Sequence, residues 1–172
     1  MLISRSENVI LRHIEKSDLE VLAPFANNIE IAKNLRNGFP HPYTINNAYD
    51  FYTLIQSQTP QSFFVIDYEK KFAGMISLAP LSDVYCKTAE IGYWLAVPYW
   101  NKGIMTTSVR LIVEWGWQNL DIVRIHTGIF SHNLSSARVL EKAGFTFECE
   151  FVNSVYKNGE LLNELRYSLL KP

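Results

Sequence analysis

The chain has 172 residues, of which 48% are hydrophobic and 19% are charged, and its formal net charge is −1. This length predicts one domain over residues 1–172, the composition excludes a disordered chain, and the near-neutral charge argues against nucleic-acid binding. No apolar run approaches the roughly 20 residues of a membrane span and no secretory signal opens the sequence, so we expect a cytoplasmic protein that does not bind membranes.

The first 60 residues predict one strand followed by two helices. Residues 9–14 alternate apolar and polar side chains, which is typical of a strand. Ser17 can cap a helix with a helical apolar period, and Pro24 inside that helix predicts a kink or an interruption. Residues 36–43 form a loop by their glycine and proline content, and Thr44 caps the second helix.

Strands dominate the middle of the chain. Residues 62–69 and 71–80 flank a tight turn and predict a hairpin. Residues 88–97 predict a third strand, which Pro98 ends. A helix follows Gly103, and a β-branched run at residues 122–130 predicts the next strand.

The last part of the chain predicts a short helix and two more strands. Asn133 or Ser135 caps this helix and Gly144 closes it. Asn158 and Gly159 form a hairpin turn between two strands within residues 145–170. The resulting order, β-α-α-β-β-β-α-β-α-β-β, predicts a mixed α/β domain.

The junction "YWNKGIMTTSV" (residues 99–109) has the features of an anion site. The first backbone N–H groups of a helix lack intrahelical partners, and the helix dipole adds positive potential there. Gly103 permits a tight turn, Lys102 supplies a cation and Thr106 supplies a hydroxyl. Taken alone, the same pattern also fits an ordinary strand–helix junction. Neither a dinucleotide-binding nor a P-loop glycine motif is present.

The surrounding sequence extends this pattern. "AEIGYWLAVPYWNKGIMTTSVRLIVEWGW" followed by "IHTGIFSHNLSSARVLEKAGF" resembles the GNAT superfamily of acetyl-CoA-dependent N-acetyltransferases, and within it the RimJ/RimL-type branch. The resemblance covers nearly the whole chain. It implies a single α/β (α+β) domain with a mostly antiparallel, twisted sheet flanked by helices, and it implies acetyl-CoA as the cosubstrate.

The resemblance also assigns residues to coenzyme A. The pyrophosphate would lie on the turn, the backbone of the preceding strand end would pair with the pantetheine amides, and Asn133 would bond the pantetheine arm, with Ser136 near the sulfur. Met105 departs from the family pattern, which has a small residue there, and Asn133 alternatively serves only as a helix cap. The implied coenzyme A residues are Leu95, Ala96, Val97, Asn101, Lys102, Gly103, Ile104, Met105, Thr106, Asn133 and Ser136.

Acetyl transfer from a thioester needs a neutral amine, donors for the developing oxyanion and a proton for the thiolate. Glu90 is the candidate base, with a surface-facing strand charge as the alternative, and Tyr93 lies on the opposite strand face and is expected in the core. Ser136 or a nearby tyrosine is the candidate acid. Val155 stands where some relatives carry an acidic residue, which adds weight to Glu90. Neither the histidines nor the two cysteines have metal-ligand spacing, so we expect no metal.

The acceptor is the least constrained part of the prediction. By resemblance, the loop at residues 36–43 forms one wall of its site, with Phe39 and His41 as candidate contacts and Tyr156 as a third. We expect a protein N-terminal α-amine, and the alternative is a small amine such as an aminoglycoside or a polyamine. A catalytically silent acyl-CoA-binding module and a nucleotide-binding protein are two competing hypotheses for the whole chain, and either a monomer or a homodimer fits the sequence.

Overall fold

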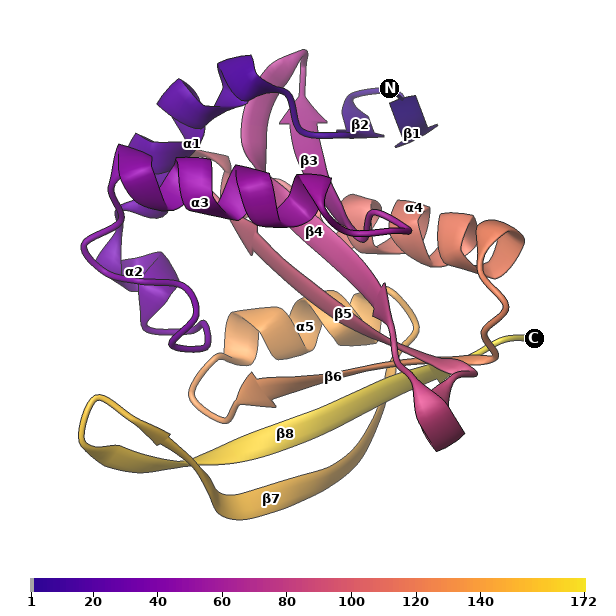
Figure 1. Ribbon diagram of the computed structural model, residues 1–172. Coiled ribbons are helices and arrows are strands. Elements are labelled where there is room, and N and C mark those ends of the chain that lie inside the picture. Colours follow the sequence, from indigo (N-terminus) through magenta and orange to yellow (C-terminus); the bar gives the residue numbers. More distant parts are fainter. Residues whose placement is uncertain (1) are drawn as a thin grey trace.

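The computed structural model describes residues 2–172 and contains one eight-stranded sheet in the order β1-β2-β3-β4-β5-β6-β8-β7 (Figure 1). The strands are β1 Leu2–Arg5, β2 Val9–Arg12, β3 Phe63–Tyr68, β4 Lys71–Pro80, β5 Thr88–Leu95, β6 Arg124–Phe130, β7 Thr146–Lys157 and β8 Glu160–Leu170. The helices are α1 Leu19–Ala26, α2 Ile29–Ala32, α3 Ile45–Gln56, α4 Ile104–Asn119 and α5 Leu134–Lys142, with 3-10 turns η1 Lys16–Asp18, η2 Asp83–Tyr85 and η3 Val97–Tyr99.

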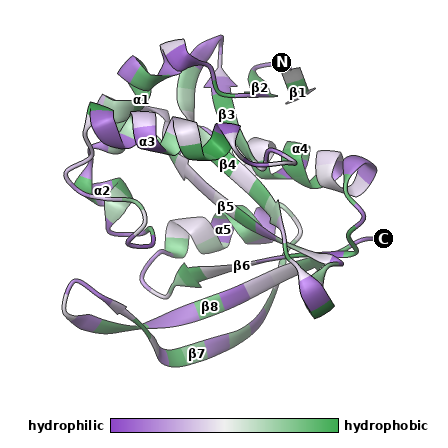
Figure 2. Ribbon diagram, in the orientation of Figure 1, coloured by the Kyte–Doolittle hydropathy of each residue, from purple (hydrophilic) through white to green (hydrophobic). Residues whose placement is uncertain are grey.

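Helices cover both faces of this sheet. On one face, α4 and α5 pack on the strands through residues such as Ile104, Ile112 and Leu140. On the other face, α1 and α3 pack on β3 and β4 through residues such as Leu22 and Ile55. Hydrophobic and hydrophilic residues alternate along α3 and α4 (Figure 2), as expected for helices that bury one face. The sheet is therefore the middle layer of the molecule.

Local signals in the sequence fix several element ends. Thr44 and Asn47 form the reciprocal capping box of α3, and the Asn133 side chain accepts a hydrogen bond from Ser136 N–H at the start of α5. Asn158 and Gly159 have φ values of 53° and 88°, which the two-residue turn between β7 and β8 requires. These predictions are confirmed, and so is the mixed, mostly antiparallel α/β fold.

Other boundaries differ from the sequence-based expectation. The structure adds β1 and the one-turn helix α2, and α1 runs through Pro24 to Ala26. The third expected strand ends at Leu95 rather than at residue 97, because Val97–Tyr99 turns into η3. Residues 122 and 123 precede β6, which starts at Arg124. Among residues 2–172, no helix combines the length and the apolarity that crossing a membrane requires.

The feature of the fold that creates a site is the parting of β5 and β6. These two strands are parallel neighbours, and their register runs only from Thr88 opposite Arg124 to Glu90 opposite His126. Beyond this point β6 continues to pair with β8 while β5 continues to pair with β4. Figure 1 shows the two strands close together at the right and apart at the left, with α5 behind the opening. Where the two strands separate, the edges of β5 and β6 that face each other therefore have no strand partner between them.

Candidate active site

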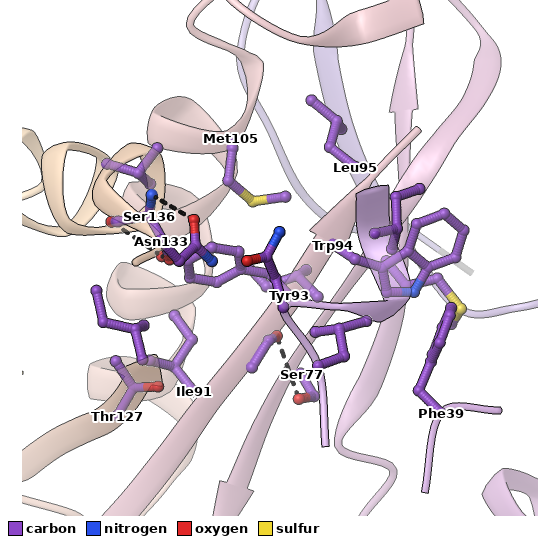
Figure 3. Close-up of a pocket in the computed structure, with 18 of the residues that line it drawn as sticks. Phe39, Ser77, Ile91, Tyr93, Trp94, Leu95, Met105, Thr127, Asn133 and Ser136 are labelled. Carbon is purple, nitrogen blue, oxygen red and sulfur yellow. Dashed lines mark hydrogen bonds between the residues drawn. The ribbon is translucent and has the colours of Figure 1, made fainter. Parts of the chain in front are cut away.

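A cleft of about 1020 Å³ occupies the opening between β5 and β6. Its walls come from β5, the end of β6, the start of α4, α5, and the segment from α2 to α3. The residues in Figure 3 show how these elements converge: Tyr93 and Leu95 come from β5, Met105 from α4, Asn133 and Ser136 from the start of α5, and Phe39 from the loop before α3.

The backbone of β5 presents hydrogen-bonding groups to this cleft. Ala96 N–H donates to Ala73 O, and Gly92 O accepts from Ser77 Oγ, so these even-numbered residues direct their polar groups toward β4. Because backbone groups alternate in direction along a strand, Tyr93 and Leu95 direct theirs toward the opening. Trp100 Nε1 donates a hydrogen bond to the Leu95 carbonyl at 2.7 Å. The Leu95 N–H and the N–H and carbonyl of Tyr93 therefore remain directed at the cleft.

The turn before α4 places backbone N–H groups at one end of the cleft. Asn101 and Gly103 both have left-handed backbone conformations, with φ values of 61° and 75°, and Gly103 is the N-cap residue of α4. The first intrahelical bond runs from Thr107 N–H to Gly103 O. The N–H groups of Ile104, Met105 and Thr106 therefore precede the helical ladder in a segment that lines the cleft, as an anion site requires.

Met105, the departure from the family pattern, is mostly removed from the cleft. Its side chain is 8% exposed and packs in the core with Ile104 and Val109. Its sulfur end extends from α4 toward the other residues that line the cleft (Figure 3). The long side chain at this position is accommodated by the core beneath α4.

Three of the positively charged residues that line the cleft come from the turn before α4 and from α5. Lys102 in the turn before α4 and two residues of α5, Arg138 and Lys142, supply cations at the end near this turn. Arg110 Nη2 donates to Lys142 O at 2.5 Å and so joins α4 to α5. Sequence reasoning missed Arg138, although its spacing of four from Lys142 places both on one helix face. Phosphate groups suit this end of the cleft.

Tyr93 and Ser136 join β5 to α5 inside the cleft. Tyr93 Oη lies 2.7 Å from Ser136 Oγ, and the Asn133 Oδ1 accepts from Ser136 N–H at 3.2 Å. Burial raises the pKa of the Tyr93 phenol well above its ordinary value. Tyr93 packs on the core as expected, but its hydroxyl also belongs to the site, which the sequence did not predict. The pair provides a fixed hydroxyl beside the β5 backbone.

Glu90 lies at the last position where β5 pairs with β6, and Arg36 holds its carboxylate. Arg36 Nη1 donates to Glu90 Oε2 at 3.3 Å, and Nη2 forms a short ion pair with Oε1. The carboxylate side chain is 27% exposed and lines the cleft, so it is not a freely solvated strand charge. His126 is its register neighbour on β6. The sequence contains no local signal for the Arg36 contact, which spans 54 positions.

An aromatic wall lines one end of the cleft, where the loop before α3 meets β5. The Phe39 ring centroid lies 5.8 Å from that of Trp94 and 5.0 Å from that of Tyr43. Burial, with Asp50 nearby, raises the pKa of Tyr43 to about 12, so its phenol is neutral. Glu30, Asp50 and Glu90 are the carboxylates of the lining. This end can hold an apolar chain that carries an amine.

Several candidate residues lie outside the cleft lining. Ala96 is fully buried and its N–H is used by β4, and Val97 is 38% exposed in η3. His41 is exposed in its loop, and Tyr156 is 70% exposed on β7. The structure thus brings most of the coenzyme A candidates together with Glu90, Ser136 and Phe39, but not these four. Residues 2–172 contain no group of three or more potential metal-ligating side chains.

Comparison with protein families gives a match over most of the chain. Residues 8–146 match the family model described as "Acetyltransferase (GNAT) domain". This range includes β5, the turn before α4, and α5, so it contains the residues that build the cleft.

Individual proteins similar to the chain are also named as acetyltransferases. The Bacillus subtilis (strain 168) "Probable N-acetyltransferase YjcK" is 38% identical over 104 residues, which are 60% of this chain and 58% of YjcK. The Escherichia coli (strain K12) spermidine N(1)-acetyltransferase is 24% identical over 170 residues, 96% of this chain and 88% of that protein. The solved structure of RimL, a ribosomal L7/L12 α-N-protein acetyltransferase in complex with coenzyme A, is 21% identical with a TM-score of 0.85 and covers 99% of this chain and 98% of its own.

Proposed function

Because this chain belongs to the GNAT acetyltransferase family, and its reaction is therefore acetyl-CoA-dependent N-acetylation, we propose that its acceptor is a protein N-terminal α-amine. We further propose that the amine attacks the thioester directly while both substrates are bound, so that no acetyl-enzyme forms. Proximity of the two bound substrates supplies much of the rate in such a mechanism.

The residues of the cleft fit coenzyme A. The N–H groups at the start of α4 and the cations Lys102, Arg138 and Lys142 suit its phosphates. The N–H of Leu95 and the carbonyl of Tyr93 suit an added strand-like partner, and pantetheine is one. Asn133 Nδ2 remains available to this arm because the cap uses only Oδ1. Bound acetyl-CoA supplies an activated acyl group whose leaving group is a thiolate.

The protein groups around the reacting atoms have separate roles in this proposal. Glu90 accepts the amine proton directly or through water, because a free α-amine has a pKa of about 8 and is largely protonated at neutral pH. The Tyr93 N–H, which lies farther from the turn than Leu95, stabilises negative charge that develops on the carbonyl oxygen. Ser136, oriented by Tyr93, donates its hydroxyl proton to the leaving sulfur.

The observation that carries the N-terminal acceptor is the composition of the aromatic end of the cleft. Phe39, Tyr43 and Trp94 form an apolar wall beside Glu90. Such a wall suits a peptide that threads its first residues toward the β5 backbone. Glu90 is paired with Arg36 and Glu30 with Lys33 at 2.5 Å, so a polycation would have to displace two cations to use both carboxylates, whereas a single α-amine displaces only one.

A polyamine is the second candidate acceptor. Asp50 and Glu30 line the same end of the cleft, and the spermidine acetyltransferase of E. coli aligns with 96% of the chain. Asp50 is the one lining carboxylate without an ion pair in the described residues, so a short diamine would still find a partner.

One assay separates these functions. Thiol release from acetyl-CoA is measured with an N-terminal peptide panel and with spermidine, using the wild type, Glu90→Gln and Ser136→Ala. The proposal expects turnover with peptides that falls strongly in both variants. Turnover with spermidine alone contradicts the N-terminal acceptor. Stabilisation by coenzyme A of about 2.7 kcal/mol at roughly 100 times its dissociation constant, without turnover on any amine, indicates a silent binding module.

A further inference from the structure

The Arg36–Glu90 pair is the unexplained element of the acceptor site. A general base must exchange protons with an acceptor amine, yet here both carboxylate oxygens contact a guanidinium. The Arg36 side chain is 66% exposed, compared with 27% for Glu90. Because an exposed ion pair contributes at most about 1 kcal/mol, an incoming ligand can open this pair at little cost.

The backbone that carries the exposed Arg36 side chain is anchored by contacts on both sides. Phe39 N–H donates to Arg36 O at 2.9 Å within the turn. On one side, Asn34 Oδ1 lies 3.0 Å from His132 Nε2, and on the other, Lys157 Nζ of the β7 strand donates to Asn37 Oδ1 at 3.3 Å. The loop is therefore tied to β7 and to the segment before α5. Arg36 is thus an exposed cation on an anchored backbone.

Arg36 is also the one cation at the acceptor end of the cleft lining. The other lining cations, Lys102, Arg138 and Lys142, lie on α4 and α5 or just before them, at the end that suits phosphates. At the acceptor end, Arg36 stands beside Glu90 and the aromatic wall. A cation and an anion held side by side are complementary to a ligand that carries both charges in the opposite order.

We propose that Arg36 and Glu90 form a charge-recognition pair for a zwitterionic acceptor, that is, a peptide whose first or second residue carries a carboxylate beside the α-ammonium group. The acceptor carboxylate takes the Arg36 guanidinium, and the ammonium group takes Glu90. The ammonium proton then passes to the Glu90 carboxylate, which leaves the amine nitrogen neutral. This inference rests on the proposed function, since it specifies which N-terminal amines the site prefers.

This exchange explains why a base would be paired in the free protein. Without an acceptor, Arg36 neutralises a carboxylate that lines the cleft. With a zwitterionic acceptor, both charges exchange partners and neither is left unpaired. An acceptor with a basic second residue gains no partner and meets Arg36 as a like charge, which disfavours it.

The test uses three peptides that differ only at the second residue, which is glutamate, glutamine or lysine. Initial rates of thiol release give kcat/KM for each peptide with the wild type, Arg36→Gln, Arg36→Glu and, as a remote charge control, Arg5→Gln. Arg5 is exposed on β1 and lies outside the cleft lining. The wild type and Arg5→Gln should prefer the glutamate peptide over the lysine peptide by about tenfold, equivalent to one charge-assisted contact.

The Arg36 variants should change selectivity rather than catalysis as such. In Arg36→Gln the preference should fall to within about twofold, through a KM that rises more for the glutamate peptide than for the glutamine peptide. In Arg36→Glu the lysine peptide should become the better substrate. The wild-type preference should also shrink at 0.5 M salt, because exposed charges are screened over roughly 10 Å or less. A merely structural role for Arg36 predicts none of these changes in selectivity.

The outcomes distinguish a failure of the charge-recognition pair from a failure of the proposed N-terminal acceptor. Equal acetylation of the three peptides by the wild type, or a preference that Arg36→Gln leaves intact, overturns the charge-recognition pair and leaves the N-terminal acceptor standing. Acetylation of spermidine with no turnover on any peptide overturns both.

Discussion

Tyr93 Oη lies 2.7 Å from Ser136 Oγ and so connects the central strand β5 with the first turn of α5 inside the cleft. Burial raises the pKa of the phenol, so Tyr93 keeps its proton at neutral pH. A protonated phenol that donates to Ser136 leaves the serine hydroxyl proton free for another acceptor. This relationship makes Tyr93 a positioning residue for Ser136.

Tyr93→Phe should therefore lower kcat by about tenfold, the effect of losing one oriented catalytic hydrogen bond, with the KM for acetyl-CoA little changed. The ring still packs on the core, so the free energy of unfolding should fall by only about 1 kcal/mol. Steady-state kinetics and urea unfolding measure the two effects. The informative control is the Tyr93→Phe/Ser136→Ala double variant, whose kcat should equal that of Ser136→Ala alone. Additive losses would show that Tyr93 acts independently of Ser136.

The left-handed conformation of Gly103 predicts a specific loss of coenzyme A affinity. Its φ is 75°, and an added Cβ would meet no atom within 4 Å, so strain rather than collision sets the cost of Gly103→Ala. That strain is about 1 kcal/mol, and relieving it would turn the backbone N–H groups that follow. We expect coenzyme A to bind about tenfold more weakly by isothermal titration.

Gly159→Ala is the matched control for this change. Gly159 also has a left-handed φ of 88° and no atom within 4 Å of an added Cβ, but it lies in the turn between β7 and β8. It should show a similar loss of stability with unchanged coenzyme A affinity. Equal effects of the two variants on affinity would mean that the turn before α4 does not hold the phosphates.

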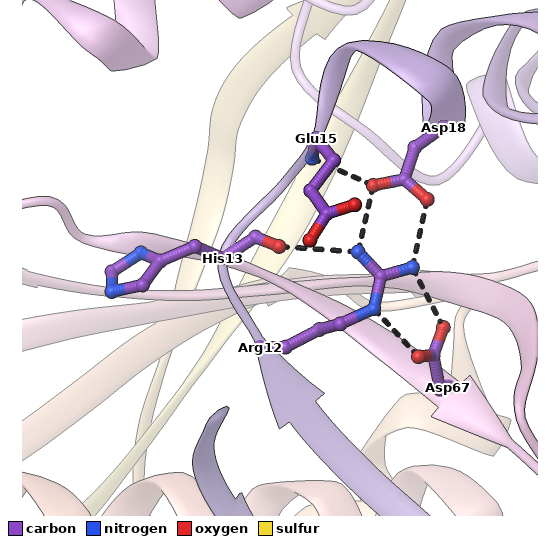
Figure 4. Close-up of polar contacts among 5 residues, drawn as sticks. All are labelled: Arg12, His13, Glu15, Asp18 and Asp67. Atoms are coloured by element: carbon purple, nitrogen blue, oxygen red, sulfur yellow. Dashed lines mark hydrogen bonds and ion pairs between the residues drawn. The ribbon is translucent and has the colours of Figure 1, made fainter. Parts of the chain in front are cut away.

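Arg12 organises a charge cluster away from the cleft, between β2, η1 and β3 (Figure 4). Its guanidinium binds both oxygens of Asp18 at 2.7 Å and both oxygens of Asp67 at 2.6 and 3.1 Å. Each carboxylate side chain is 10% exposed. Arg12→Met should lower the free energy of unfolding by about 3 kcal/mol, because it leaves two shielded carboxylates without their cation.

Arg12→Lys tests whether geometry or charge matters at this cluster. One ammonium group cannot reproduce the planar fork, so this variant should lose roughly half as much stability as Arg12→Met. Urea unfolding at neutral pH measures both variants. Coenzyme A affinity should be unchanged at temperatures where the variants are folded. Equal stabilities of Arg12→Lys and the wild type would mean that charge alone is needed.

The comparison between sequence and structure separates local from non-local signals. Thr44, Asn133 and Gly159 could be assigned because a cap or a turn depends on neighbours a few positions away. The contacts of Tyr93 with Ser136 and of Arg36 with Glu90 span 43 and 54 positions, and no periodicity reports them.

The sequence did not reveal that both faces of β5 contribute residues to the cleft. Alternation along β5 correctly separated Glu90 from Tyr93, but at the parting of β5 and β6 the cleft also reaches the face that packs on α4 and α5. A core residue can therefore also be a site residue there. The point at which β5 and β6 separate also determines which backbone N–H and C=O groups of β5 can bind a ligand. That point depends on a strand register that the sequence does not specify.

We expect the free energy of unfolding to fall in mild acid because of His126. It lies next to Glu90 in the register of β5 and β6, and Arg124, Arg166 and Glu148 also act on it. Burial lowers the pKa of His126 below its ordinary value, more than the two carboxylates raise it. As the pH falls, His126 therefore gains a proton in the unfolded chain near pH 6.5, before it does so in the folded chain. Its contribution to the free energy of unfolding is fully present above that pH and is lost as the pH drops through the folded pKa.

Urea unfolding of the wild type and of His126→Gln between pH 8 and pH 5 measures this contribution. The two proteins should differ by a constant amount above about pH 7, and the wild type should lose stability more steeply below about pH 6.5. The comparison removes the effect of His13, whose pKa burial also lowers, because His13 is present in both proteins. Parallel curves through the acid range would show that His126 gains its proton as readily in the folded chain as in the unfolded one.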